Sequence, residues 1–355
     1  MTVSGTVSRM SPHTTAQRIG SLCGGEPVSI TRAQAAGITR AEIRAAISAG
    51  TLERVRHGVV TAVDITPADP REHAIERMRA LMCRVDSDLV ISHSSAALLH
   101  RLPLPPGVDD TSIHVTSLRQ RRFRLPGVVV HAARGDVAAQ ITEVEGIPST
   151  SYLRTGIDLA RGLALRAALI PLDASVRRAV IEDPCHQKSL HDDQRAESAI
   201  VTDRVLHSVQ QQVARLRYCT GIDGLRFAAS VTSPLSESPL ESASRGDLID
   251  AGFAPLTLQY RYTDADGRDR RADMLLAEGL IGEADGMVKY DGEAGTRRLK
   301  EEKLRDLATA EVGIRTLRWS ATDVWSRRNS WIRHVRREIY AARRLHRNPL
   351  TKWSP

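Results

Sequence analysis

The first sixty residues show the apolar spacing of short helices, with polar residues marking their ends. Thr31-Arg-Ala-Gln34 and Thr39-Arg-Ala-Glu42 both have the form of a capping box, in which Gln or Glu follows a threonine N-cap by three residues. Gly37 and Gly50 stand where a C′ glycine would end each helix. The pattern predicts two short helices joined at a glycine, the second running from Arg40 to Ala49, as in a helix-turn-helix.

A strand pattern follows these helices. Residues 52–61 alternate between apolar and polar side chains around Gly58, as the two strands of a hairpin do. Two helices followed by a hairpin predict a winged helix-turn-helix over residues 13–62. Residues 1–12 are expected to form a disordered leader.

Helical and strand patterns are mixed between residues 70 and 181, which predicts a mixed α/β middle domain. Helices are expected at 71–84, 92–101, 150–162 and 164–181, strands at 111–117 and 127–133, and a turn at Gly146-Ile-Pro148. The polar run 182–195 is expected to be a loop, and a helical stretch from 196 to 229 completes a connecting segment over 182–232.

From Ser238 onward helices and strands alternate. Helices are expected at 239–251, 297–311 and 321–345, strands at 255–262, 270–276, 280–290 and 314–318, and a turn at 264–267. This order predicts a C-terminal α/β domain over residues 233–346, in which helices flank a sheet. The expected fold class of the whole chain is multidomain α+β.

Length and composition set limits on the class of protein. The chain has 355 residues, enough for two or three domains. No segment has the roughly 18 consecutive apolar residues that cross a bilayer, and the N-terminus lacks the apolar run of a secretion signal. The four cysteines form no Cys-x-x-Cys pair, which favours reduced thiols in the cytoplasm over a disulfide frame or a zinc site.

The net charge of +8 favours a polyanionic partner, above all nucleic acid. Arg40 and Arg44 share a face of the second helix, and Arg54 and Arg56 share a face of the wing strand by alternation. These four are the candidate contacts to DNA phosphates and one groove. A GC-rich genome, which raises arginine content generally, and a winged helix used for protein contact are the alternatives.

The predicted C-terminal helix is also basic. Trp325, Ile332, Val335 and Ile339 recur at roughly helical spacing and are expected to pack on the sheet. The other face carries the arginines at 327, 328, 333, 336, 337, 343 and 344. This face is expected either to follow a nucleic-acid backbone or to be merely solvated.

Three carboxylates gather on two adjacent predicted strands. Asp273 precedes an apolar run, and Glu283 and Asp285 alternate on the next strand, so that they share a face. If the strands pair, their oxygens converge as Mg²⁺ (or Mn²⁺) requires to activate water for phosphodiester cleavage. Lys289 has the same parity but lies roughly 20 Å further along a straight strand. The local alternatives are a surface ion pair from Asp273 to Arg270 or its neighbour, and a turn at 285–286.

Four histidines raise the question of a second metal site. His93 and His100 are seven residues apart on a predicted helix and share a face, and His114 and His131 lie on predicted strands. No cysteine or acidic residue stands at ligand spacing from them. Core or surface histidines are therefore the favoured interpretation.

Motifs in the C-terminal part resemble a known superfamily. They are Ser238-Pro-Leu-Glu-Ser242, the strand ending in Asp273, Glu283-x-Asp-Gly-x-x-Lys-Tyr290, Glu302-Lys303-x-Arg305-Asp306 and Gly313-x-Arg-x-x-Arg318-Trp319. In this order they resemble a Vsr-like branch of the PD-(D/E)XK nucleases. The resemblance implies a restriction-endonuclease-like sheet with Glu241, Asp273 and Glu283 as acidic positions, of which Asp273 and Glu283 would hold the metal.

The chain departs from this superfamily at the catalytic lysine. That lysine follows its acid at a spacing of two, where this chain has Asp285. Lys289 or Lys303 would have to supply the ammonium group, or it is absent. Glu241 has an alternative role, because Ser238-Pro-Leu-Glu241 is itself a capping box with proline at N1.

The N-terminal part is similar to a second family. The segments are the helix-turn-helix and wing at 31–61, Ser92-His-Ser-Ser-Ala-Ala-Leu-Leu-His100, Gly146-Ile-Pro-x-Thr150 and Arg154-Thr-Gly-Ile-Asp158-Leu-Ala-Arg161. They resemble type IV antitoxins of the AbiEi class, which implies a nucleotidyltransferase-like toxin as partner. The leading hypothesis is an antitoxin-like DNA-binding protein; an active magnesium-dependent endonuclease and a regulator with an inactive nuclease fold are the alternatives.

Overall fold

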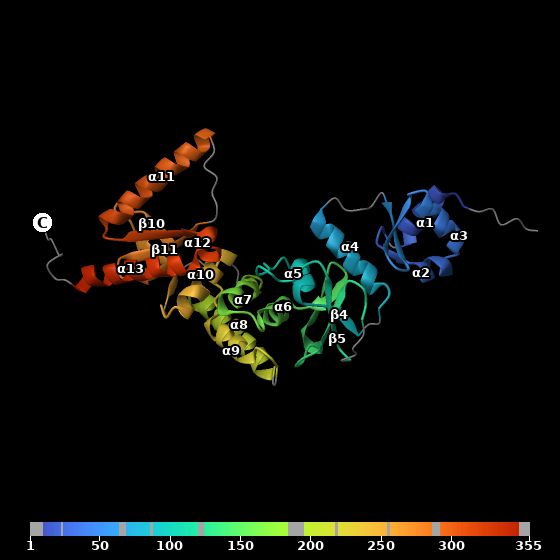
Figure 1. Cartoon of the computed structure of the whole chain (residues 1–355), viewed down its shortest axis with the longest axis horizontal. Helices are drawn as coiled ribbons and strands as arrows, with labels where there is room; N and C mark the ends of the chain where they lie inside the picture. Colours follow the sequence, from blue (N-terminus) through green and yellow to red (C-terminus); the bar gives the residue numbers. More distant parts are fainter. Residues whose placement is uncertain are drawn as a thin grey trace, which may run out of the picture. The chain divides into compact units, whose positions relative to one another are not determined.

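The computed structural model describes residues 10–22, 24–63, 69–85, 88–119, 124–183, 195–216, 219–253, 256–285 and 292–347. The chain is a mixed α+β protein that divides into two compact units (Figure 1). The first unit comprises residues 1–101 and 109–151, and the second comprises residues 102–108 and 152–355. In the described part of the chain, no helix has both the length and the apolar composition needed to cross a bilayer.

The first unit begins with three helices and a small sheet. The helices are α1 (Pro12–Leu22), α2 (Ile30–Ala35) and α3 (Arg40–Ser48), and the strands β1 (Val28–Ser29), β2 (Leu52–Arg56) and β3 (Val59–Ala62) pair in the order β1-β3-β2. Ile19, Ile38, Ile43, Leu52 and Val60 are among the residues of their common core. The predicted order of two helices and a hairpin is confirmed, whereas α1 was not predicted and begins inside the expected leader.

The second capping box is confirmed and the first is wrong. Thr39 Oγ1 accepts from Glu42 N at 3.3 Å, and Glu42 Oε2 accepts from Thr39 N at 2.8 Å. Helix α2 is capped by Ser29, whose side chain accepts from Arg32 N at 3.2 Å, and not by Thr31. The helix begins earlier because Ser29 already has the extended backbone of β1, which an N-cap residue requires.

The rest of the first unit is built on a five-stranded sheet. Its strands are β4 (Leu89–Ile91), β5 (Ile113–Ser117), β6 (Val128–Ala132), β7 (Ile141–Val144) and β8 (Ile147–Thr150), in the order β6-β5-β4-β8-β7, with α4 (Pro70–Met82) and α5 (His93–His100). The turn predicted at 146–148 is misplaced, because Pro148 belongs to β8 and the chain turns at Glu145 and Gly146, both with positive φ. Three of the five strands were not predicted, since β4, β7 and β8 are each at most four residues long.

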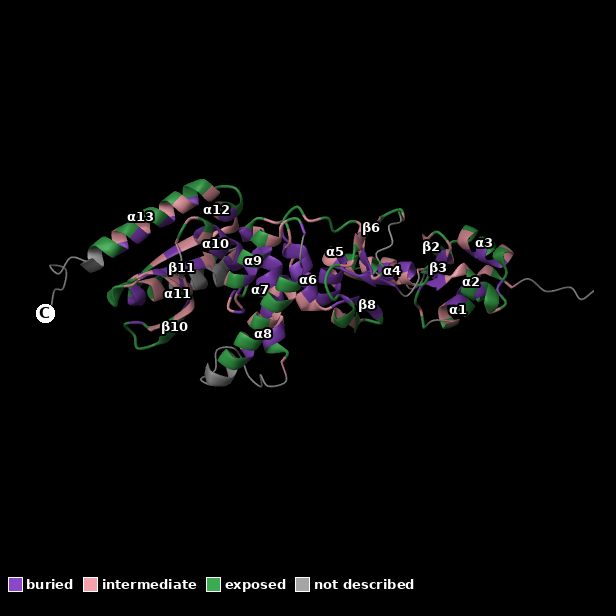
Figure 2. Cartoon of the chain, turned by 90° about the horizontal axis from the view of Figure 1, so that it is seen from below, coloured by how far each residue is buried: buried purple, intermediate pink, exposed green. Residues whose placement is uncertain are grey.

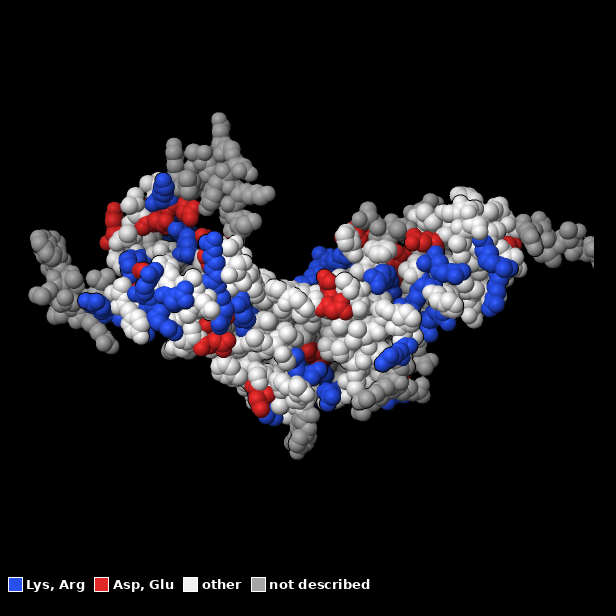
Figure 3. Space-filling model, viewed as in Figure 1, with Lys and Arg blue, Asp and Glu red and all other residues white. Residues whose placement is uncertain are grey.

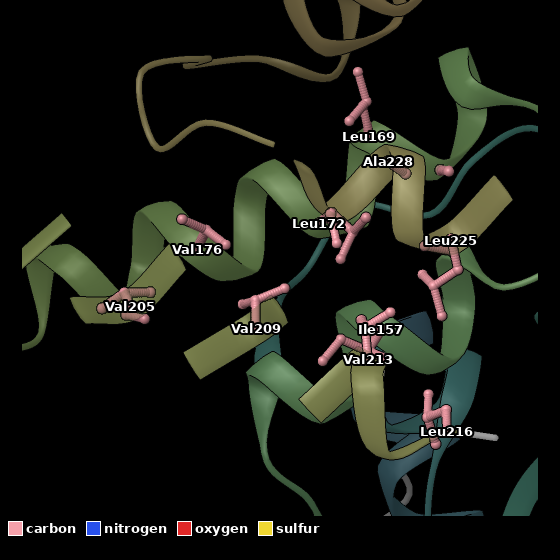
Figure 4. Packing of buried hydrophobic residues seen from close by; sticks show 14 of the residues in the cluster. Ile157, Leu169, Leu172, Val176, Val205, Val209, Val213, Leu216, Leu225 and Ala228 are labelled. Atoms are coloured by element: carbon pink, nitrogen blue, oxygen red, sulfur yellow. The ribbon is translucent and has the colours of Figure 1, made fainter. Parts of the chain in front are cut away.

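The second unit begins with α6 (Tyr152–Ala160), α7 (Leu165–Ile181), α8 (Arg195–Arg215) and α9 (Ile222–Val231). Figure 4 shows how Ile157, Leu172, Val209, Val213 and Leu225 from these helices pack together. The single helical stretch predicted at 196–229 is two helices, separated at Gly221. The φ of Gly221 is +80°, and a Cβ added to it would lie 2.7 Å from the backbone of Gly162. The chain therefore turns at a position where only glycine fits.

A four-stranded sheet completes the second unit. Its strands are β9 (Thr257–Thr263), β10 (Asp269–Ala277), β11 (Leu280–Asp285) and β12 (Arg315–Ser320), in the order β12-β11-β10-β9. Strands β9, β10 and β11 are antiparallel neighbours, and β12 returns parallel to β11. The accompanying helices are α10 (Pro239–Asp250), α11 (Gly292–Glu311), α12 (Ala321–Trp325) and α13 (Arg328–Arg347). The predicted sheet with flanking helices is confirmed, with one C-terminal helix divided into α12 and α13.

The sheet has an apolar face and a charged face. Met274, Leu276, Leu317 and Trp319 pack with α10 and α13 in one core, and alternate along their strands with the charged residues described below. Figures 1 and 2 show α11 and α13 on opposite sides of this sheet. Trp325 was predicted to pack on the sheet with Val335 and Ile339, but the tryptophan that does so is Trp331. Trp325 ends α12, is 37% exposed and lies under the guanidinium of Arg166.

Helix α10 is fixed to α7 by a buried ion pair. Both Asp173 oxygens accept from Arg245 Nη2 at 2.8 Å, and Asp173 also accepts from Thr232 Oγ1 at 2.8 Å and from Ser233 N at 3.0 Å. Neither charged side chain is more than 5% exposed. At Gly246 the helices touch, because an added Cβ would lie 2.6 Å from Arg166 Cα. The position of α10 is therefore set by charge and by close backbone contact.

We expect Arg245→Met to destabilise the protein by about 3–5 kcal/mol, because it leaves the Asp173 carboxylate buried without its counter-ion. Urea denaturation followed by tryptophan fluorescence measures the effect. The matched control is Arg226→Met, which removes only the exposed pair with Asp223 and should cost at most about 1 kcal/mol. Equal losses of stability in the two variants would show that the buried pair stabilises the protein no more than the exposed pair does.

Candidate functional site

The candidate site is the charged face of the four-stranded sheet, where the predicted acidic residues meet. Asp273 lies on β10, and its Oδ2 accepts from Ala284 N on β11 at 2.7 Å. Burial raises the pKa of Asp273, the hydrogen bond from Ala284 lowers it, and the charges of Glu283 and Asp285 raise it further. The strands thus bring Asp273, Glu283 and Asp285 together, as the alternation predicted.

Glu283 is occupied by two arginines. Its Oε2 lies 2.6 Å from Arg305 Nη2 of α11 and 3.0 Å from Arg318 Nε of β12, and the residue is only 8% exposed. Glu283 and Arg318 are direct partners in the parallel register of β11 and β12. Of the ion-pair partners considered for Asp273, Arg270 binds Asp264, and its neighbour Arg271 binds Glu237 with both terminal nitrogens. The charge of Arg271 also acts on Asp273, whose pKa it lowers.

Arg318 is the cation at the centre of this face. Its terminal nitrogens donate to the two oxygens of Asp306 at 2.8 and 2.6 Å, and its Nε also lies 3.6 Å from Asp285 and 3.5 Å from Glu302. The hydrogen bonds that Arg318 donates to Asp306 raise the pKa of Arg318, so the side chain stays charged. Arg318 belongs to a motif noted in the sequence, but no role was predicted for it. Only the parallel pairing of β12 with β11 places it beside Glu283.

Glu241 lies at the start of α10, close enough to Asp273 for their charges to interact. Ser238 Oγ donates to Oε1 at 2.8 Å, and Glu237 N donates to Oε2 at 2.9 Å. Burial is the largest influence and raises the pKa of Glu241 to about 7, with a further contribution from the charge of Asp273. Ser238 Oγ accepts from Glu241 N at 3.2 Å, as the capping alternative predicted, whereas the Glu241 carboxylate binds the Ser238 hydroxyl and Glu237 N in place of Ser238 N. Glu241 also contributes to the acidic face.

Of the two predicted lysines, Lys303 does not join these residues. Lys303 is exposed on α11, and no ion pair to an acidic residue is found for it within the described part of the chain. Lys289 lies outside the described residues. Among the described residues, Arg305 and Arg318 are the cations that contact Glu283.

As they are placed, the described side chains do not form a metal site. Within the described ranges no group of three or more His, Cys, Asp or Glu side chains is placed to hold a metal ion. The reason is visible at Glu283, whose Oε2 is bound by two guanidinium groups, and at Asp273, whose Oδ2 is bound by a backbone amide. Guanidinium groups supply the positive charge that a divalent cation would bring.

The predicted DNA-contacting arginines differ in exposure. Arg40 and Arg44 of α3 and Arg54 of β2 are exposed, and none makes an ion pair with a carboxylate in the described ranges. Arg56 is half-buried, its Nη2 donates to Pro126 O at 3.2 Å, and burial lowers its pKa. The shared face predicted for Arg54 and Arg56 assumed strict alternation, which a register shift between 53 and 56 interrupts.

The histidines form contacts among themselves. His93 has a φ of +50° and stacks on His131 with ring centroids 3.5 Å apart, and His114 Nδ1 lies 3.0 Å from His131 Nε2. His100 is buried, with Nε2 2.7 Å from Thr150 O. Sequence spacing did not predict that three of these rings would meet.

Comparison with known proteins adds no assignment. A scan against protein-family models found no match, and no curated protein matches the chain. The family resemblances drawn from the motifs therefore stay predictions.

We expect Glu241→Gln to make stability less dependent on pH. A carboxyl group whose folded pKa is raised to about 7 from 4.5 costs stability as pH rises through that interval, because deprotonation is easier in the unfolded chain. At pH 4 the variant and the native chain should be equally stable, and at pH 8 the variant should gain about 1–3 kcal/mol. Urea midpoints at a series of pH values provide the measurement. A stability difference that is constant from pH 4 to 8 would contradict the raised pKa; Glu301→Gln, on the exposed part of α11, is the control.

Proposed function

We propose that the protein is a DNA-binding regulator, similar to AbiEi-class antitoxins, whose C-terminal domain has a nuclease-like sheet that serves binding and not cleavage. The observation that carries the DNA-binding part is the exposed basic face of α3. Arg40 and Arg44 lie four residues apart beyond the Thr39 cap, so that their side chains project from one side of the helix. Arg54 on the adjacent hairpin is also exposed.

The side of α3 opposite the arginines packs on the core of the protein, so the arginine side is the one available to enter a major groove. Ile43 and Ala46 are buried in the core with Ile38, and Glu42 is occupied by the cap and by Met10 N. The arginines therefore stay free for phosphates, while the rigid cap holds the N-terminal end of α3 in place. A regulator that binds DNA in this way would restrain a partner through its other domains, and the AbiEi resemblance suggests a nucleotidyltransferase-like toxin.

The binding role of the C-terminal domain is supported by the arginines on its acidic face. In a metal-dependent nuclease the carboxylates must be open to a cation, whereas here Glu283 and Asp306 have guanidinium partners at 2.6–3.0 Å. Asp285 stands where the superfamily has its lysine. A nuclease-like scaffold with this charge arrangement is suited to hold a partner without cutting it.

A Mg²⁺- or Mn²⁺-dependent endonuclease is the alternative, and one observation favours it. Burial and mutual repulsion raise the pKa of Glu241, Asp273 and Asp285, which is the electrostatic condition of a site that attracts a cation. Displacement of Arg305 and Arg318 from Glu283 would be needed before a metal could bind there.

We expect Arg40→Ala/Arg44→Ala to weaken binding to a duplex from the region upstream of the protein's own gene by about 10-fold or more, and to lower the salt dependence of log K by about 2. Fluorescence anisotropy over a salt series measures both quantities. Arg226→Ala, an exposed arginine of α9, should leave them unchanged. If the double variant bound the duplex as tightly as the native chain, α3 would not be part of the DNA-binding surface.

We expect purified protein to leave supercoiled plasmid intact in Mg²⁺ or Mn²⁺, because Glu283 is held by arginine. Agarose electrophoresis of the native chain beside Asp273→Ala/Glu283→Ala is the measurement. Cleavage by the native chain that the variant has lost would establish the endonuclease alternative and reject the binding role.

A further inference from the structure

Helix α13 carries an exposed face made of arginines around one tyrosine. Its apolar side, formed by Trp331, Val335, Ile339 and Ala342, is buried in the core of the four-stranded sheet. The outer side carries Tyr340, which is 61% exposed. Five exposed arginines lie on the same side of the helix: Arg333, Arg336, Arg337, Arg343 and Arg344. Figure 3 shows the positive atoms gathered over α13, in the lower left of the view.

The spacing places the tyrosine among the guanidinium groups. Arg336 and Arg337 precede Tyr340 by four and three residues, and Arg343 and Arg344 follow it by three and four. These are the positions that neighbour a residue on a helix surface. An aromatic ring that needs burial is thus exposed at the centre of four cationic side chains.

The charges of this face are not neutralised within the described part of the chain. Arg315 of β12 and Arg328 at the start of α13 pair with Glu338 and Asp247. By contrast, the five outer arginines make no ion pair with a described carboxylate. Three of them have only neutral partners: Arg333 donates to Ser330 Oγ at 3.0 Å, Arg336 to Ala251 O at 3.4 Å, and Arg337 contacts His334 Nδ1 at 3.1 Å. Each guanidinium group keeps N–H donors for an anionic ligand.

We propose that this α13 face binds single-stranded DNA, with the arginines contacting phosphates and Tyr340 stacking on an unpaired base. Phosphates supply the negative charge that the face lacks, and an exposed aromatic ring offers a platform that only an unstacked base can use. In a duplex the bases are already stacked, so a duplex would use the arginines but not Tyr340. The choice of DNA over RNA rests on the proposed function; the surface itself is separate from α3.

The test uses the full chain carrying Arg40→Ala/Arg44→Ala, so that α3 does not contribute. Its binding to a fluorescein-labelled, mixed-sequence single strand of about 20 nucleotides is measured by anisotropy beside the same sequence as duplex and as RNA. In this background Tyr340→Ala should weaken single-strand binding about 5- to 100-fold, and Tyr340→Phe, which keeps the ring, should not. Arg337→Ala/Arg344→Ala should lower the salt slope by about 1.4.

Controls and outcomes separate this inference from the proposed function. Arg268→Ala, an exposed arginine in the turn between β9 and β10, should change nothing. Equal affinity for single strand and duplex, stronger binding of RNA, or insensitivity to Tyr340→Ala would each overturn the assignment of single-stranded DNA. Two results together would keep the α13 inference and reject the proposed role of α3. The first is that Arg40→Ala/Arg44→Ala, introduced alone, leaves duplex binding unchanged. The second is that Tyr340→Ala abolishes single-strand binding.

Discussion

The second unit depends on the contact between α7 and α10. Asp173 and Arg245 form a buried ion pair with further hydrogen bonds from Thr232 and Ser233, and Gly246 lets the two backbones touch. The next residue of α10, Asp247, binds Arg166 of α7 and Arg328 of α13. A single helix therefore fixes both the Glu241 end of the charged face and the start of the basic helix. Loss of that contact would disturb two surfaces that are distant in sequence.

Electrostatics at the charged face decide how its carboxylates can interact with a cation. Burial is the largest influence that raises the pKa of Glu241 and of Asp273, and repulsion between neighbouring carboxylates of α10, β10 and β11 adds to it. Arg318 and Arg305 offset this repulsion at Glu283. The same arginines would compete with a cation for the carboxylate oxygens. This charge arrangement is the observation that supports the proposed binding role over cleavage.

Local signals predicted much of this fold, and long-range contacts account for what they missed. The Thr39 cap and the Ser238-Pro239 start of α10 were predictable because a cap depends on four consecutive residues. The cap of α2 was assigned to Thr31 because nothing local shows that Ser29 ends a strand paired with β3. The convergence of Asp273, Glu283 and Asp285 followed from alternation, whereas the role of Arg318 depends on the parallel register of β12, which sequence spacing does not reveal.

The most direct test of the account is the mobility of the upstream duplex on a native gel, with the full chain in EDTA and in Mg²⁺. If α3 binds through arginines and the acidic face is neutralised by Arg318, retention will be equal in the two conditions and intact duplex will be recovered from both. Retention that requires Mg²⁺, or shortened DNA in the Mg²⁺ lane alone, would contradict the account.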